Sequence, residues 1–101
     1  MDISYRNLKM KKLFEDEKAL ICYYGQRMAD KINQRISELQ AAENPKCLPP
    51  ACRFHEHGGG RKGLFSLDLV HPQRMIVCPT CEYEDYTKIT SVEIYEIMDP
   101  H

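Results

Sequence analysis

Residues 64–77 read LFSLDLVHPQRMIV, and this stretch decides the fold class. Apolar and polar residues alternate from Leu64 to Val70, which is typical of a strand with one buried face. The pair His71-Pro72 interrupts the pattern, and a second apolar run follows from Arg74 to Val77. Two such runs joined by a short break predict a β-hairpin.

Two helices are predicted upstream of this hairpin. Asn7 is a suitable N-cap, and Gly25 stands where a helix would end. The apolar residues between them fall on one side of a helix and are Met10, Leu13, Phe14, Leu20, Ile21 and Tyr24. A second helix that ends near Ala42 is predicted from the spacing of Met28, Ile32, Ile36 and Leu39.

Strands are also predicted near both ends of the sequence. Residues 3–5 indicate a short first strand, and residues 88–98 are rich in β-branched residues. Prolines at 45, 49 and 50 and glycines at 58–60 predict connecting segments. Helices followed by strands, without alternation of the two types, predict an α+β fold in which two N-terminal helices pack on an antiparallel sheet of three or four strands.

Composition limits the class of protein. The 101 residues, 43% hydrophobic and 29% charged, predict a single globular domain over residues 1–101. No apolar run is long enough for a membrane span, and residues 1–4 lack the features of a secretory leader. We therefore expect a cytoplasmic protein with reduced cysteines. The sequence also lacks a helix-turn-helix signature, which argues against a DNA-binding repressor.

The net charge of −1 hides an uneven distribution of charge. Residues 81–101 hold six acidic residues and one lysine, whereas residues 47–80 hold four basic residues, two acidic residues and three of the four histidines. The basic residues of this central region are Arg53, Arg61, Lys62 and Arg74. A local basic region can contact phosphate even when the whole chain is slightly acidic.

Four of the five cysteines form two close pairs. Cys47 and Cys52 are separated by four residues, and Cys78 and Cys81 by two. Four thiolates at these spacings suit a structural zinc site, which is the alternative to cysteines that merely pack or lie in turns. A redox role for the second pair is disfavoured, because the acidic residues that follow it would raise a thiol pKa.

Several ordered motifs extend over most of the chain. They are residues 55–69 (HEHGGGRKGLFSLDL), 71–76 (HPQRMI) and 99–101 (DPH), with residues 5–7, 11–13, 24–25 and 35–41 upstream. In this order they resemble the RelE/ParE toxin superfamily, in its HigB-like branch. The resemblance implies a microbial RNase-like fold, with two helices on a twisted antiparallel sheet. It also implies a type II toxin that cleaves mRNA on the ribosome without a metal or cofactor and is held inactive by an antitoxin protein.

The resemblance further implies roles for individual residues. RNA supplies its own nucleophile, the 2′-OH, so the protein needs a base, an acid and cations that stabilise the phosphate charge. Imidazoles suit proton transfer near neutral pH, and a guanidinium can bind two phosphate oxygens. The implied catalytic set is His55, Lys62, Arg74 and His101, and the implied substrate-binding set is His57, Arg61 and Asp99.

Two departures from the family pattern keep an alternative open. Gly58 stands where the family has a lysine, and Pro100 where it has a tyrosine. Both positions belong to the implied active site. The alternative is a non-enzymatic binding protein on the same fold, which includes inhibition of gyrase in the manner of ParE. A zinc-stabilised interaction module is the third reading.

Overall fold

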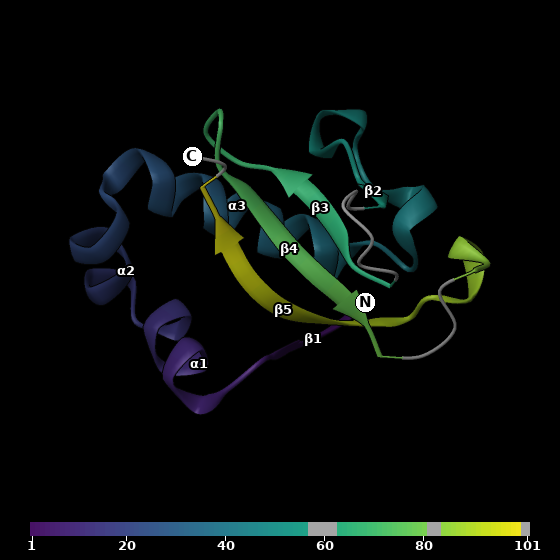
Figure 1. The fold of residues 1–101 in the computed structure, drawn as a ribbon, viewed down its shortest axis with the longest axis horizontal. Helices are drawn as coiled ribbons and strands as arrows, with labels where there is room; N and C mark the ends of the chain where they lie inside the picture. Colours follow the sequence, from purple (N-terminus) through teal and green to yellow (C-terminus); the bar gives the residue numbers. More distant parts are fainter. Residues whose placement is uncertain (57–62, 81–83, 100–101) are drawn as a thin grey trace.

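A computed structural model describes residues 1–56, 63–80 and 84–99 of the chain. Within these ranges it has an α+β fold of three helices and one five-stranded sheet (Figure 1). The helices are α1 (Leu8–Glu15), α2 (Glu17–Tyr24) and α3 (Gln26–Ala41). The strands are β1 (Asp2–Tyr5), β2 (His55–Glu56), β3 (Phe65–Asp68), β4 (Arg74–Pro79) and β5 (Ser91–Met98). Short 3₁₀ turns at Pro45–Cys47 and Pro50–Cys52 connect α3 to β2.

The first predicted helix is two helices, because the chain breaks at Asp16. The side chain of Asn7 accepts a hydrogen bond from the Met10 amide at 2.8 Å and caps α1, as predicted. Asp16 is extended, and its carboxylate accepts from the Ala19 amide at 3.2 Å, which caps α2 in the same way. An aspartate at such a position competes with helix continuation by bonding to the backbone itself. The expected break at Gly25 is confirmed by its positive φ of 88°.

The sheet has the strand order β1-β5-β4-β3-β2. The predicted hairpin is confirmed, since β3 and β4 pair antiparallel from Phe65↔Val77 to Asp68↔Arg74. The prediction of an antiparallel sheet of three or four strands is wrong, because β1 pairs parallel with β5 and β2 adds a fifth strand. Parallel pairing needs a long connection, which the three helices and the following strands provide. The pairing of such distant segments leaves no signal in local alternation.

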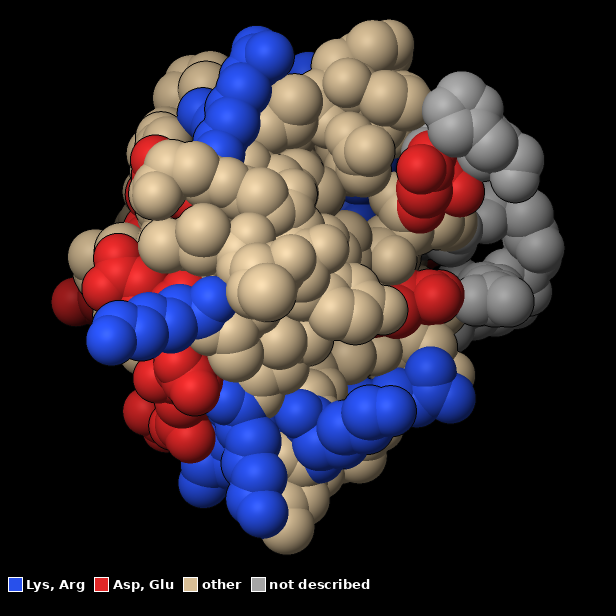
Figure 2. Space-filling model, turned by 90° about the vertical axis from the view of Figure 1, so that its left-hand side faces the viewer, with Lys and Arg blue, Asp and Glu red and all other residues tan. Residues whose placement is uncertain are grey.

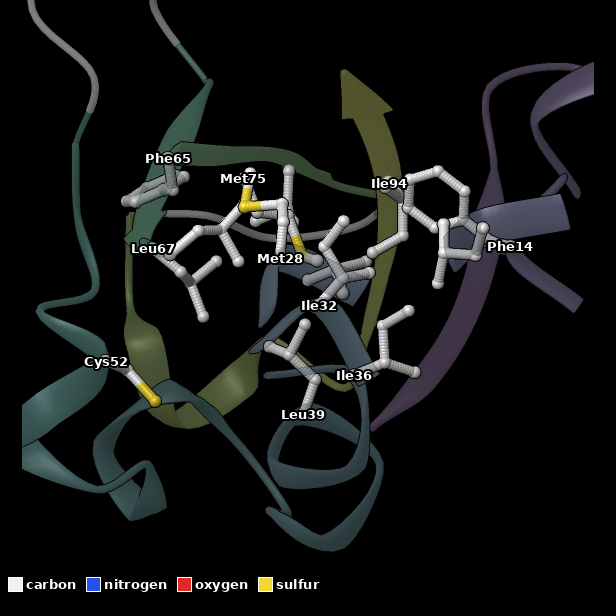
Figure 3. Close-up of a cluster of buried hydrophobic side chains, with 14 of the residues drawn as sticks. Phe14, Met28, Ile32, Ile36, Leu39, Cys52, Phe65, Leu67, Met75 and Ile94 are labelled. Atoms are coloured by element: carbon white, nitrogen blue, oxygen red, sulfur yellow. The ribbon is translucent and has the colours of Figure 1, made fainter. Parts of the chain in front are cut away.

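The hydrophobic core lies between α3 and one face of the sheet (Figures 1 and 3). The four residues predicted to form the apolar side of the second helix are all buried there. The helix residues are Met28, Ile32, Ile36 and Leu39, and Phe65, Leu67, Met75 and Ile94 meet them from the sheet. In the view of Figure 1, α3 lies behind the sheet and none of the three helices lies in front of it.

Candidate functional site

The sheet brings two of the predicted catalytic residues onto the face opposite α3. Successive side chains of a strand point to opposite faces, and paired residues of neighbouring strands point to the same face. Phe65, Leu67 and Met75 point toward α3. The side chains of the opposite face, here called the distal face, are therefore those of His55, Ser66, Asp68, Arg74 and Ile76.

His55 and Arg74 lie two strands apart on the distal face. His55 pairs with Ser66, and Arg74 pairs with Asp68 one pleat further along β3. From ordinary strand spacing, their Cα atoms are separated by about 12 Å. Both side chains remain partly exposed, whereas Ser66 has no exposed surface.

Arg74 of the distal face and Arg53, which reaches this face at Asp68, differ in their ion pairing. Arg53, which precedes β2, lies 3.3 Å from the carboxylate of Asp68. Arg74 takes part in neither of the ion pairs found within residues 1–56, 63–80 and 84–99. The charge of Arg53 is therefore partly neutralised by Asp68, and Arg74 is the better placed of the two to bind an added anion.

Hydrogen bonds hold the His55 ring at both nitrogens. The Nδ1 atom lies 2.5 Å from the Arg53 carbonyl oxygen, which only accepts, so Nδ1 carries a hydrogen. The Nε2 atom lies 3.1 Å from the Ser66 hydroxyl. In the neutral ring Nε2 is then the proton acceptor, and Ser66 donates to it. This arrangement fixes the tautomer that a general base at Nε2 requires.

We expect NMR to find the hydrogen of neutral His55 on Nδ1. Long-range ¹H–¹⁵N correlation spectra distinguish the two tautomers, and a hydrogen on Nε2 would contradict the assignment.

Ser66→Ala removes a buried cross-strand bond, so the free energy of unfolding in urea should fall by about 1 kcal/mol. The matched control Ser37→Ala, on the exposed side of α3, should leave it nearly unchanged.

A buried arginine attaches the segment before β2 to the rest of the fold. Arg35 is 4% exposed. Its Nε donates to the Asp68 carbonyl at 2.6 Å, and Nη2 donates to the Ala51 carbonyl at 3.1 Å. Nη1 donates to Glu38 at 2.7 Å, and the Cys52 thiol donates to the same carboxylate at 3.1 Å. The network joins α3, β3 and residues 51–52, and thereby positions Arg53 and His55.

Of the remaining predicted site residues, the structure describes Asp99. His57, Arg61, Lys62 and His101 lie outside the described residues, and their roles stay predictions. Asp99 is exposed just after β5. It lines a cavity of about 500 Å³ together with Arg27 and Gln73, next to the β3–β4 connection. Of the predicted set, His55 and Arg74 are the pair that the described sheet places on one face.

The described cysteines among the predicted zinc ligands, Cys47, Cys52 and Cys78, lie in different parts of the fold. Cys52 lies in the core on the α3 side of the sheet, Cys47 is exposed, and Cys81 lies outside the described residues. Cys78 follows core-facing Val77 on β4 and points to the distal face. Burial, and then the Glu93 carboxylate, raise the pKa of Cys78. Within the described residues, no three metal-binding side chains come together.

Cys52 should react slowly with iodoacetamide. Burial, followed by its bond to Glu38, raises the pKa of this thiol from 9.0 to about 11. Thiolate is the reactive form, so alkylation at pH 8 should be at least about tenfold slower than at exposed Cys22 and Cys47. Peptide mass spectrometry at timed intervals would measure the three rates, and equal rates would contradict the buried position.

Because the pKa of Cys52 is raised in the folded state, its protonated thiol stabilises the fold below about pH 9. This contribution is lost as the pH rises toward about 11.

Three residues of this region were not among the predicted site residues. Ser66 occupies a polar position of the hairpin, which predicts exposure, yet it is fully buried. Arg35 lies three residues after Ile32, at the margin of the apolar side of α3, and this spacing was the sequence feature that could have indicated its burial. Arg53 was counted in the basic region, but its pairing with Asp68 depends on the tertiary fold.

Comparison of the chain with protein-family models, with curated proteins and with solved structures finds no match. In the part of the chain that the structure describes, the helices are too short or too polar to cross a bilayer.

Proposed function

We propose that this chain is a type II toxin of the RelE/HigB kind, a cytoplasmic endoribonuclease that cleaves mRNA on the ribosome and is inhibited by an antitoxin. The observation that carries the proposal is the distal face, where Arg74, outside both ion pairs of the described residues, and His55, fixed with Nε2 as acceptor, lie two strands apart. The order of the sequence motifs is the second support. The finer fold assignment, a microbial RNase-like sheet, belongs to the same proposal.

The proposed reaction begins with proton transfer from the RNA. The Nε2 atom of His55 exchanges its bond to Ser66 for the 2′-OH of the substrate and takes its proton. The 2′-oxygen then attacks the adjacent phosphorus, and the bond from phosphorus to the 5′-oxygen breaks. The products are a 2′,3′-cyclic phosphate and a free 5′-OH, so no water or cofactor is consumed.

Charge stabilisation is assigned to Arg74. Negative charge grows on the phosphate oxygens as the 2′-oxygen attacks, and a guanidinium that stays protonated can bind two of these oxygens at once. Lys62 would add a second cation. His101 would give a proton to the leaving 5′-oxygen. Both assignments come from the family resemblance, as do substrate contacts by His57, Arg61 and Asp99.

The proposal is tested with purified protein and a reconstituted translation system. The readout is the 5′ ends of a defined mRNA, mapped by primer extension after the protein is added. The matched control is the same mRNA with its start codon changed, so that ribosomes do not translate it. We expect new ends within translated codons and none in the control.

Two other results would each contradict the proposal. Intact mRNA would favour the non-enzymatic alternative, and a gyrase supercoiling assay on the same protein would then test inhibition in the manner of ParE. Equal cleavage of both mRNAs would indicate a ribonuclease that does not depend on the ribosome.

A further inference from the structure

The backbone of Arg53, the residue two positions before His55, has a conformation that is rare for its residue type. Among the described residues other than glycine, Arg53 alone has a positive φ, and its φ and ψ are both 49°. This is the left-handed region, which glycine adopts freely, asparagine tolerates and β-branched residues avoid. Such conformations persist only where the surrounding structure fixes them, and they cluster at functional sites.

The turn that precedes Arg53 is anchored to the rest of the fold. The Arg53 amide donates to the Pro50 carbonyl at 3.1 Å, which closes a short 3₁₀ turn. The Ala51 carbonyl in this turn accepts from buried Arg35 at 3.1 Å. The chain is therefore fixed up to Arg53, and the left-handed conformation of this residue directs it into β2.

The next two side chains point to opposite faces of the sheet. The Phe54 ring stacks on the core residue Phe65, with ring centroids 4.9 Å apart, whereas His55 points to the distal face. The carbonyl of Arg53 lies beside the His55 ring and accepts from Nδ1 at 2.5 Å. The direction of this carbonyl depends on ψ of Arg53, so a change to the extended region, about 90° away in ψ, would turn it from the ring.

The two hydrogen-bond partners of the His55 ring differ in what they require of it. A carbonyl oxygen only accepts, so the Arg53 carbonyl requires a hydrogen on Nδ1. The Ser66 hydroxyl at Nε2 can donate or accept, and it would satisfy either tautomer. The tautomer is therefore set at Nδ1, by the carbonyl.

We propose that Arg53 is a positioning residue, whose left-handed backbone holds His55 with its hydrogen on Nδ1. The guanidinium takes no part in this, since the Arg53 side chain is 68% exposed and pairs with Asp68. The positioning is a property of the fold and is measured without a substrate. Its consequence for mRNA cleavage rests on the proposed function, because Nε2 is free to act as a base only in this tautomer.

The test compares variants of Arg53 by the ring ¹⁵N shifts of His55, recorded at about pH 8, where histidine is ordinarily neutral. Arg53→Gly and Arg53→Asn remove the charge but keep the left-handed conformation, so the hydrogen should stay on Nδ1. Arg53→Val disfavours that conformation, because two heavy atoms crowd its Cβ. In this variant the two ¹⁵N shifts should converge, as they do when both tautomers are populated.

Controls separate the backbone of Arg53 from other effects on the His55 ring. Ser66→Ala should leave the hydrogen on Nδ1, because the carbonyl of Arg53 remains. His71, an exposed histidine of the β3–β4 connection, should show the same ¹⁵N shifts in every variant. Exposed Lys and Arg side chains also lie at the α1–α2 end of the molecule, which Figure 2 faces and which is the far end from β2 in Figure 1. Lys12→Ala, on α1, removes one positive charge there and should leave the His55 shifts unchanged.

Cleavage of a translated mRNA is the second readout. Arg53→Val should slow cleavage by at least about tenfold, as expected when a general base is not held in its active form, whereas Arg53→Gly should slow it by less. If the wild type does not cleave mRNA, the proposed function fails, and the ¹⁵N shifts still decide the positioning role of Arg53.

Three results would overturn the positioning role. Loss of the Nδ1 hydrogen in a folded Arg53→Gly would assign the tautomer to the arginine side chain. Its retention in a folded Arg53→Val would show that the left-handed conformation is not required. Its loss in Ser66→Ala would assign the tautomer to the serine. If Arg53→Val does not fold by circular dichroism, Arg53→Gly and Ser66→Ala decide the question.

Discussion

Arg74→Ala should reduce the rate of mRNA cleavage by about 100- to 1,000-fold, the usual effect of removing one group that stabilises transition-state charge. This expected loss follows from the position of Arg74 in the sheet. Arg74 opens β4 on the distal face, pairs in register with Asp68, and takes part in neither ion pair of the described residues. Its charge is therefore available to the phosphate. The measurement is the rate of cleavage of a translated mRNA by purified wild type and variant.

The matched control is Arg53→Ala. Arg53 lies on the same face but is ion-paired with Asp68, so its removal should slow cleavage by less than about tenfold. Arg74→Lys should recover part of the activity, because it keeps the charge but loses the two-oxygen contact. Cleavage by Arg74→Ala at the wild-type rate, with the fold intact by circular dichroism, would remove Arg74 from the mechanism. If only Arg53→Ala were impaired, phosphate binding would be assigned to Arg53 in place of Arg74.

Arg35→Ala should lower the free energy of unfolding by about 3–5 kcal/mol, as expected when one partner of a buried ion pair is removed. The side chain is almost fully buried and donates to Glu38 and to the carbonyls of Ala51 and Asp68. Without it, the carbonyls of Ala51 and Asp68 lose this donor, and Glu38 keeps only the hydrogen bonds from Cys52 and Gln34. Urea unfolding followed by circular dichroism would measure the change, and a loss below about 1 kcal/mol would contradict the network.

Arg27→Ala is the control for this experiment, since Arg27 is an exposed arginine of the same helix. Its removal should change the free energy of unfolding by no more than about 0.5 kcal/mol.

The pH dependence of the free energy of unfolding is a second readout. Burial acts to raise the pKa of Glu38, but hydrogen bonds from Arg35, Cys52 and Gln34 outweigh it, and the pKa is lowered from 4.5. Glu38 therefore stabilises the fold above about pH 4.5 and loses this effect as the pH falls. Arg35→Ala should flatten that acid dependence.

The parts of the fold predicted from sequence are those with local signals. The apolar spacing of α3, the cap at Asn7 and the alternation around Leu67 each arise within a few residues, and each is confirmed. The break at Asp16 had a signal, an aspartate able to cap α2, but the apolar pattern continued across it. The pairing of β1 with β5 had none, because it joins segments from opposite ends of the sequence.

The candidate site divides in the same way. Placing Arg74 at the start of a strand needed only the hairpin pattern, and the register of β3 and β4 then sets the face on which it lies. The accessibility of its charge could not be predicted, since that depends on Asp68 pairing with Arg53 instead. Nor could the tautomer of His55, which follows from the carbonyl of Arg53 and a serine on the neighbouring strand.

The position of β5 between β1 and β4 has a consequence for synthesis of the protein. During translation, α3 and the β3–β4 hairpin can form from neighbouring residues as soon as they leave the exit tunnel. β1 is made first but has no strand to pair with until β5 emerges. The nascent chain therefore carries β1 without its partner strand until β5 has been synthesised. β5 then pairs with β1 on one side and with β4 on the other, and so joins β1 to the hairpin.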